Sequence, residues 1–434
     1  MFIFTLLVFP RGWVSFKLIL LAITLILIYT RLLFRQELII SKNIIIPSLL
    51  ILIVGIFSAL YGLIMNNPGA MEVMKETVIY LAIWLLFLPG IIDDDLLIYF
   101  HRTLIISTCI ILLFSLATAL KFIGVWPDYL YYNIYKSFWS NPLNPVPLIS
   151  YKLVYSVGAS INDIATLTDF IEFEMPYFRS FMFIFPYLMT FVIFSKKNTI
   201  LQFILLITTG LFMIFSSSKV LMLVFIVFTF FILLQKRLFI IKHIIRYRKK
   251  TKKIYFLCLI LVVTYIMISY FSISPWSYIK NFIEGFFFTN TDLEGNVAVN
   301  QRYAQFISLF NSWSERPLFG YGSGAVSYPI RSIVSPWAYE LTYSQMLFNF
   351  GLIGMFIYTA SFSYIIYCII SIYKISPNDN IYYLCIMNGS LGFFLGCSTN
   401  PILFSFEGIF IFFLLLAIIN IYYNGNNAYK SNIR

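Results

Sequence analysis

Five cationic residues could form one outer site, and their type suits the binding of phosphate: Arg179 and Lys219 beside apolar segments, and Arg302, Arg316 and Arg331 within a polar loop. Guanidinium and ammonium groups donate charge-assisted hydrogen bonds to phosphate oxygens. An ionisable group so close to lipid is a functional candidate. Structural explanations stay open, since Arg179 could extend towards lipid head groups and Lys219 could belong to the turn of a helical hairpin. These residues predict a cationic site for a phosphorylated substrate.

Glu340 is the acidic residue best placed to act beside these cations. It closes a polar loop and opens the apolar segment 341–373, and Gly351 follows it by eleven residues. Eleven residues make about three helical turns, so a continuous helix would present Glu340, Tyr343, Leu347 and Gly351 on one face. A carboxyl group at an apolar boundary often has a raised pKa, which suits a general base. The alternative is a carboxylate that only marks the start of a helix, where the helix dipole favours it.

The segment before Glu340 contains a predicted helix and a glycine-rich stretch. Within residues 300–313, the side chains of Tyr303, Phe306, Ile307 and Phe310 recur at the spacing of one face of an amphipathic helix, with Arg302 beside them. The sequence PLFGYGSG follows at 317–324, with glycine at alternate positions. Such a backbone can expose several N–H groups to an anion. It can also form an ordinary turn, and the sequence leaves both interpretations open.

Composition identifies the environment in which these residues act. Apolar residues make up 60% of the chain and charged residues only 11%, whereas a soluble globule needs about a quarter of its residues charged. The mean hydropathy is +0.87. We therefore expect an all-α polytopic membrane protein. All five cysteines lie in apolar stretches and only two histidines occur, which argues against a disulfide framework and against a histidine-rich metal site.

Eleven apolar segments are long enough to cross a membrane, at about 20 residues per span. Their approximate bounds are 14–30, 44–64, 77–92, 97–120, 177–194, 199–215, 220–235, 254–273, 341–373, 381–397 and 402–423. The apolar residues before Pro10 are too few for a full span and are a candidate for a partial twelfth helix. The expected architecture is thus one of about eleven to twelve transmembrane helices.

Lysine and arginine predict how these spans are oriented. The loop 236–253 alone carries nine of them, so we assign it to the cytoplasmic side. Alternation then gives 18 Lys and Arg against 5 Asp and Glu inside, and 12 against 13 outside, with a cytoplasmic C-terminus. A basic cytoplasmic loop suits anionic lipid. Nucleic acid is therefore not an expected partner, although the net charge is +12.

Two long external loops divide the chain into five regions. The regions are the N-terminal transmembrane helices 1–120, the first large loop 121–176, the central transmembrane helices 177–273 with the basic loop 236–253, the second large loop 274–340, and the C-terminal helices with the cytoplasmic tail, 341–434. Long structured loops usually carry function. Aromatic residues gather within 122–139 of the first loop, where they suit either stacking on sugars or the aromatic belt of a membrane interface.

These features together resemble the O-antigen polymerase (Wzy) and O-antigen ligase superfamily. The resemblance rests on the many spans, a large external loop late in the chain, Arg302, the helix through Trp313, RPLFGYG at 316–322, and Glu340 with Gly351. The SSSK at 216–219 is similar to the S-x-S-R of that superfamily, and Arg179 is similar to its upstream arginine. The resemblance covers the architecture of the chain, with motif support over 177–220 and 300–354.

The sequence differs from the superfamily pattern at several positions, and the glutamate in place of histidine favours a polymerase over a ligase. The ligases of the superfamily have a pattern similar to H-[NSQ]-x9-G-x-x-[GTY] at the start of the following span, whereas this chain has E-L-x9-G-L-I-G from Glu340. Lys219 replaces an arginine, and Thr190 stands where some polymerases have a glycine eleven residues after the upstream arginine. A ligase that transfers glycan to lipid A-core and a non-enzymatic flippase of lipid-linked oligosaccharides remain the alternatives.

The resemblance implies a glycosyltransferase of the membrane-embedded C type in the bacterial inner membrane, with its active site facing the periplasm. Its donor and acceptor would be undecaprenyl-diphosphate-linked oligosaccharides, with membrane lipid around them and a chain-length regulator protein as a further candidate partner. No cofactor and no metal is implied, because cations can stabilise a diphosphate leaving group. The implied catalytic residues are Glu340, Arg179 and Arg302, and the implied substrate-binding residues are Lys219, Arg316, Arg331 and Tyr343.

Overall fold

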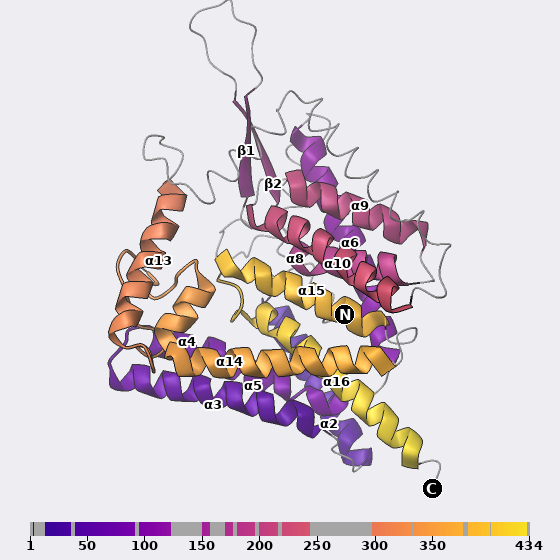
Figure 1. The fold of residues 1–434 in the computed structure, drawn as a ribbon, viewed down its shortest axis with the longest axis horizontal. Helices are drawn as coiled ribbons and strands as arrows, with labels where there is room; N and C mark the ends of the chain where they lie inside the picture. Colours follow the sequence, from indigo (N-terminus) through magenta and orange to yellow (C-terminus); the bar gives the residue numbers. More distant parts are fainter. Residues whose placement is uncertain are drawn as a thin grey trace, which may run out of the picture. The chain divides into compact units, whose positions relative to one another are not determined.

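A computed structural model describes a protein built from helices and one pair of strands (Figure 1). The described parts are residue 3 and residues 14–35, 40–91, 95–122, 150–156, 170–176, 180–195, 199–215, 219–243, 297–330, 334–375, 381–399 and 401–431. Within them the chain forms two compact units. The first contains Met1–Ile26 and Leu97–Arg237, and the second contains Leu27–Leu96 and Leu238–Arg434. Helix α2 (Val14–Arg35) contributes residues to both.

The first unit contains α6 (Asp95–Phe122), α8 (Phe181–Phe194), α9 (Ile200–Phe215) and α10 (Lys219–His243). Helix α8 is apolar on all sides and buried from Phe181 to Val192, as expected of a helix enclosed by others. His101 of α6 joins three of these helices. Its ring nitrogens contact the Tyr187 hydroxyl of α8 at 3.0 Å and the Gln202 amide of α9 at 3.1 Å. This packing explains the buried histidine without a catalytic role.

The first unit also contains two strands, which the expectation of an all-α protein did not include. Strand β1 (Ser150–Ser156) pairs antiparallel with β2 (Phe170–Pro176), so that Ser150 is opposite Pro176 and Ser156 is opposite Phe170. Both segments are rich in β-branched or aromatic residues: valine and tyrosine in β1, and isoleucine and phenylalanine in β2. That composition favours strands. The pair lies within the first large loop, between predicted spans.

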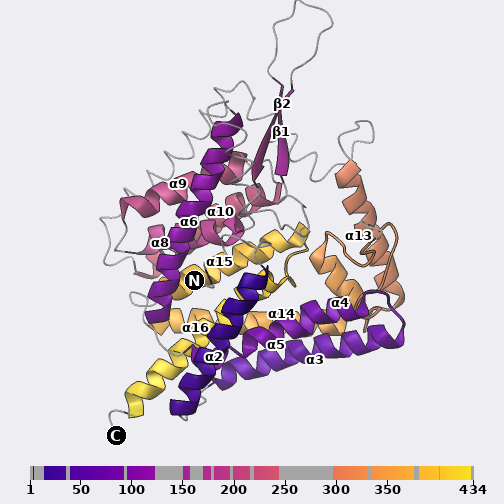
Figure 2. The same cartoon turned by 180° about the vertical axis from the view of Figure 1, so that it is seen from behind.

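The second unit is built around the antiparallel neighbours α3 (Lys42–Ile64) and α14 (Thr342–Ile375), which run side by side (Figures 1 and 2). Helix α4 (Ala70–Met74), a π-helical turn (Lys75–Ile79) and α5 (Tyr80–Leu85) follow α3. Helices α15 (Ile381–Gly396) and α16 (Phe406–Ser431) complete the unit's apolar core. Trp84 is 2% exposed there, with its ring against Phe406, Phe410 and Phe413.

The chain is a multi-pass membrane protein, as its composition predicted. Six segments of the described helices are long and apolar enough to cross a membrane: Lys42–Ile64, Asp95–Leu113, Val220–Arg237, Thr342–Lys374, Ile381–Thr399 and Phe406–Asn424. Helices also occupy the predicted spans near 14–30, 77–92, 177–194 and 199–215. The predicted span 254–273 lies outside the described residues. The full number of eleven to twelve transmembrane helices therefore stays a prediction.

Helix α14 is interrupted at Gly351. This residue has φ 63° and ψ −171°, a backbone conformation that side chains of L-residues rarely adopt. A Cβ atom built there would lie 2.3 Å from the carbonyl oxygen of Leu318 and 2.6 Å from the nitrogen of Gly320. The helix therefore has a glycine at 351 because the loop from Pro317 passes directly against its backbone.

This loop replaces the hydrogen bonds that the interruption removes from α14. The carbonyl oxygens of Phe348 and Asn349 accept from the N–H groups of Tyr321 and Gly322 at 2.9 and 3.0 Å. The N–H groups of Leu352 and Ile353 donate to the carbonyl oxygens of Pro317 and Leu318 at 2.8 and 3.1 Å. Buried backbone groups rarely remain unpaired. The loop and the helix are thus joined by reciprocal backbone bonds.

Candidate functional site

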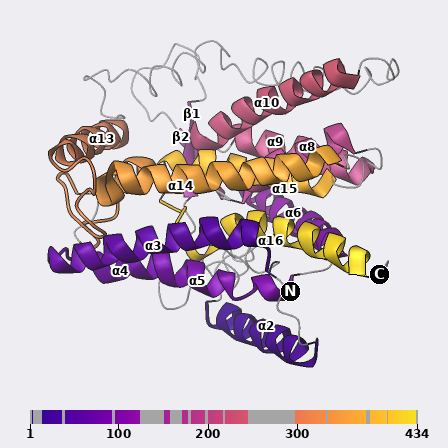
Figure 3. The ribbon, with the colours of Figure 1, turned by 60° about the horizontal axis from the view of Figure 1, so that its bottom comes forward.

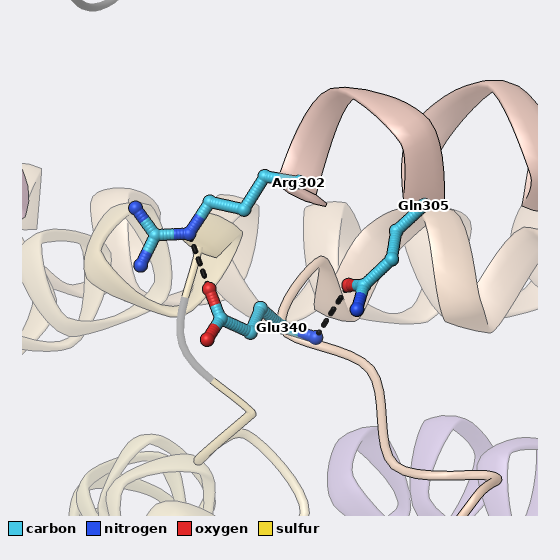
Figure 4. Close-up of polar contacts among 3 residues, drawn as sticks. All are labelled: Arg302, Gln305 and Glu340. Atoms are coloured by element: carbon cyan, nitrogen blue, oxygen red, sulfur yellow. Dashed lines mark hydrogen bonds and ion pairs between the residues drawn. The ribbon is translucent and has the colours of Figure 1, made fainter. Parts of the chain in front are cut away.

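Arg302 and Glu340 form an ion pair at the end of the second unit where α14 begins (Figure 4). Arg302 lies on α13 (Val297–Glu315), which confirms the helix predicted over 300–313. Its Nε donates to Oε2 of Glu340, a contact between residues 38 positions apart. The side chains are 33% and 20% exposed. The pair is therefore held by the protein and still open to a ligand.

The contact of Arg302 with Glu340 starts at Nε, and no contact is drawn to its terminal amino groups (Figure 4). Of the three guanidinium nitrogens of Arg302, only Nε has a hydrogen-bond partner among the described residues. Both Nη groups remain available as donors in the planar fork that suits phosphate and carboxylate oxygens. Arg302 can thus bind Glu340 and an external anion at the same time.

Gln305 fixes the backbone of Glu340 and was missed by the sequence analysis. It lies three residues after Arg302 on α13, so the two side chains share one side of the helix (Figure 4). Its Oε1 accepts the N–H of Glu340 at 3.5 Å. The side chain is 1% exposed and its Nε2 has no partner among the described residues. In the sequence Gln305 lies opposite the apolar stripe of this helix, so no signal there marked it as buried.

Tyr339 anchors the residue before Glu340 to the interior of the loop. Its hydroxyl donates to the carbonyl oxygen of Ser327 at 2.9 Å and accepts from the Ser327 N–H. The Ser327 hydroxyl contacts Ser308 and Ser312 of α13. Burial raises the pKa of Tyr339, so this residue keeps its proton and remains a donor. Through Ser327, these contacts hold Tyr339, and with it the neighbouring Glu340, close to α13.

The predicted arrangement of Glu340 on a continuous helix is wrong. Helix α14 begins at Thr342, so Glu340 precedes it, and Gly351 interrupts it. Glu340, Tyr343, Leu347 and Gly351 therefore do not form one helical face. The spacing of eleven residues instead separates two points that contact the second large loop: Glu340 pairs with Arg302, and Gly351 packs on residues 318–320. Nor does Glu340 stand alone at an apolar boundary, because Arg302 is its partner.

The glycine-rich stretch is a structural turn in which the N–H groups are already used. Gly320 donates to Arg316, Tyr321 to Phe348, Gly322 to Asn349, and Ser323 to Ser58, all at backbone carbonyl oxygens and at 2.9–3.0 Å. Asn67 also donates to the carbonyl oxygens of Tyr321 and Ser323 at 2.9 and 3.2 Å. An anion would need these N–H groups free. Of the two interpretations, the ordinary turn is the one the structure supports.

Arg316 lies away from the ion pair, and the hydroxyl of Tyr343 has a partner of its own. Arg316 follows the far end of α13, about 20 Å along the helix from Arg302 at 1.5 Å per residue. Its guanidinium lies 4.8 Å from the ring centre of Tyr321 and donates to the Tyr61 hydroxyl at 3.3 Å. Tyr343 lies one turn into the unit on α14, where its hydroxyl donates to the Phe394 carbonyl at 2.6 Å. The structure does not bring Arg316 to the ion pair.

Three other predicted site residues receive no side-chain geometry. Arg179 and Arg331 lie outside the described residues. Lys219 is the first residue of α10, but its side chain lies outside the described part. Their roles in a cationic site stay predictions. The aromatic cluster predicted to stack on sugars or on lipid head groups also falls outside the described residues, beyond Phe122.

Comparison with models of known protein families gives no match for this chain, and comparison with curated proteins gives none either.

Proposed function

We propose that this protein is a polysaccharide polymerase of the O-antigen type, which joins lipid-diphosphate-linked oligosaccharide repeats. In the reaction, the bond between the anomeric carbon of the donor and its diphosphate breaks, and the diphosphate leaves with the electron pair. A new bond forms from that carbon to a hydroxyl oxygen of the acceptor. The hydroxyl proton passes to a base. The proposal needs a cation for the leaving group and a base for the hydroxyl.

The observation that carries the proposal is the ion pair of Arg302 and Glu340, in which Arg302 keeps both Nη groups free of protein partners among the described residues. Its Nε contact with Glu340 orients the guanidinium plane. The Nη donors can then meet two oxygens of a diphosphate, and they stabilise the negative charge as it develops on the leaving group. A preorganised donor of this kind supports group transfer better than a mobile surface arginine would.

Glu340 is proposed as the base that accepts the proton of the acceptor hydroxyl. Its side chain is 20% exposed, so a substrate hydroxyl can approach it. Gln305 and Tyr339 hold its backbone, which limits its motion. General bases typically contribute about 10²–10⁴-fold to a rate. The ion pair places this base next to the proposed diphosphate site, as transfer between two lipid-linked substrates requires.

The location of the pair supports substrates that are anchored in a membrane. Glu340 lies two residues before α14, whose residues Thr342–Lys374 form one of the six apolar segments able to span a membrane. The pair thus stands at the end of a span, at the level where the head group of a lipid diphosphate would lie. Position 340 is a glutamate, whereas the corresponding position of the ligase pattern is a histidine, and this difference supports a polymerase over a ligase.

A lipopolysaccharide gel tests the proposal. Cells lacking this protein should show lipopolysaccharide capped with a single repeat, because the ligase of the cell still works. Cells with Glu340→Gln should show the same single-repeat band, because glutamine keeps the shape of the side chain and cannot take the proton. A membrane immunoblot should show the variant at the wild-type level.

Glu315→Gln is the matched control, since it removes a carboxylate from the same loop and keeps an acceptor for the Tyr321 hydroxyl. It should give the wild-type ladder. A band of bare core in the deletion strain would indicate a ligase, and unpolymerised lipid-linked repeats on the cytoplasmic face would indicate a flippase. A normal ladder with Glu340→Gln would exclude Glu340 as the base.

A further inference from the structure

Helix α13 has an apolar face that the described residues leave exposed. Tyr303, Phe306, Ile307 and Phe310 are 59%, 43%, 37% and 46% exposed. The helix instead buries the side that carries Gln305 and Leu309, each 1% exposed. A contiguous apolar surface of this kind usually marks an interaction site. The stripe predicted from the sequence is thus real, but it does not face the protein core.

Helix α13 has three distinct sides, which is the pattern of a helix at a membrane interface. At 100° per residue, the buried side, the apolar side and a polar side follow one another around the helix. The polar side carries Asn311 and Glu315, both exposed. An interfacial helix needs one side in lipid and one in water, and the third side here holds Arg302 and Gln305 for the site.

The apolar side is continuous with the lateral surface of α3. Phe57 of α3 is 53% exposed, and its ring lies 5.9 Å from that of Phe319. Next along this surface is Trp313, whose indole N–H donates to the carbonyl oxygen of Pro317 at 3.1 Å. The ring centres of Trp313 and Phe310 are 5.1 Å apart, and those of Phe310 and Phe306 are 6.1 Å apart. Helix α3 is one of the apolar segments able to span the membrane, so its exposed side faces lipid. The same apolar surface extends along α13.

The direction of α13 agrees with this continuity. Figures 1 and 3 show α3 and α14 running side by side, with α13 lying across their ends rather than along them. If α3 and α14 cross the membrane, α13 runs near the membrane plane. That is the direction of a helix that lies in an interface rather than one that spans it.

We infer that the apolar side of α13, with Leu318 and Phe319, is inserted in the lipid interface of the membrane. The occupant of this face is lipid, because the face is aliphatic as well as aromatic and continues a lipid-facing surface. A sugar platform is built mainly from aromatic rings, whereas Ile307 and Leu318 give this surface exposed aliphatic side chains. Insertion would set the depth of Arg302, which precedes Tyr303, at the level of lipid head groups. The inference does not depend on the reaction proposed above.

Spin labels on the full-length protein in vesicles of phosphatidylethanolamine and phosphatidylglycerol test the inference. The labels are attached to Phe306→Cys, Phe310→Cys or, as the matched control on the polar side, Asn311→Cys, in a chain without its five native cysteines. Collision rates are measured with oxygen, which concentrates in lipid, and with a water-soluble nickel chelate. Oxygen should dominate at 306 and 310, with an oxygen-to-nickel ratio several-fold above that at 311.

Two results would overturn the inference. Nickel access at 306 and 310 equal to that at 311 would show a face in water, where it could meet glycan. Low access to both reagents at 306 and 310 would show a face covered by protein. Size-exclusion profiles identical to that of the unlabelled protein would establish that each labelled variant is folded. Because the readout is lipid contact, loss of activity in any variant does not enter the result.

Discussion

Arg302 combines two contacts that draw on different parts of one guanidinium group. Its Nε is engaged by Glu340, while its Nη groups have no partner among the described residues. Lysine could satisfy the first contact with its single ammonium group, but it lacks the second pair of donors. Arg302 can therefore neutralise Glu340 through Nε and still offer its Nη groups to a substrate.

Replacement of Arg302 should separate these two roles. Arg302→Ala should lower the rate of chain growth by about 10²–10³-fold, the loss seen when one preorganised donor is removed. Arg302→Lys should also be impaired, because charge without the fork does not bind a diphosphate in two places. The rate is measured with isolated membranes and lipid-linked repeats, with Lys374→Ala, at the far end of α14, as the control. Full activity of Arg302→Lys would leave Arg302 with only its structural contact to Glu340.

The loop 317–324 is joined to helix α14 through backbone hydrogen bonds, although the two segments are distant in the sequence. Gly320 and Gly351 pack backbone against backbone, and a Cβ atom on Gly320 would lie 2.7 Å from the nitrogen of Gly351. This joint holds the C-terminal end of α13 against α14. The joint thus connects α13, which carries Arg302, to α14, which begins just after Glu340.

Gly351→Ala should weaken this joint. A residue other than glycine in such a conformation is disfavoured by about 1–3 kcal/mol, and the new methyl group also meets the Leu318 carbonyl. We expect the free energy of unfolding in detergent, measured by thermal denaturation, to be lower than that of the wild type. We also expect chain growth to be reduced. Gly210→Ala is the control, because its Cβ atom would meet only side-chain atoms, the nearest 3.1 Å away. Equal stability of Gly351→Ala and wild type would contradict this account of the joint.

Charge distribution orients the whole molecule in its membrane. The predicted loop 236–253 carries nine Lys and Arg, whereas the predicted external side has a small negative balance. The positive-inside rule then predicts that the start of α14, with Arg302 and Glu340, lies on the external side. Lipid-linked repeats that have crossed the membrane would be met there. The function proposed for the site therefore depends on this orientation.

Cysteine labelling in intact cells tests the orientation. In a chain without native cysteines, Asn311→Cys should react with a membrane-impermeant maleimide once the reagent has access to the periplasm. Ile245→Cys, within the basic loop, should react only after the membrane is permeabilised. Asn311 is suitable because it is exposed on the polar side of α13. The opposite pattern of labelling would invert the molecule and place the ion pair in the cytoplasm.

The sequence by itself determined the features that depend on local composition and period. Long apolar runs predicted a membrane protein and the positions of its helices, because burial in lipid needs about 20 apolar residues whatever lies around them. The period of Tyr303, Phe306 and Phe310 predicted α13. Glu340 was recognised because it stands at an apolar boundary, and Arg302 because it lies beside the amphipathic stripe and its guanidinium suits phosphate.

The tertiary structure decided which of these local features meet. A period shows that residues share a face, but it does not show whether that face contacts protein, lipid or water, and the apolar side of α13 is exposed. Spacing also assumes a continuous helix, whereas the loop at 317–322 takes over hydrogen bonds of α14 around Gly351. The pairing of Arg302 with Glu340 joins residues 38 positions apart. Such contacts depend on the path of the chain between them, because no local preference in either segment specifies its distant partner.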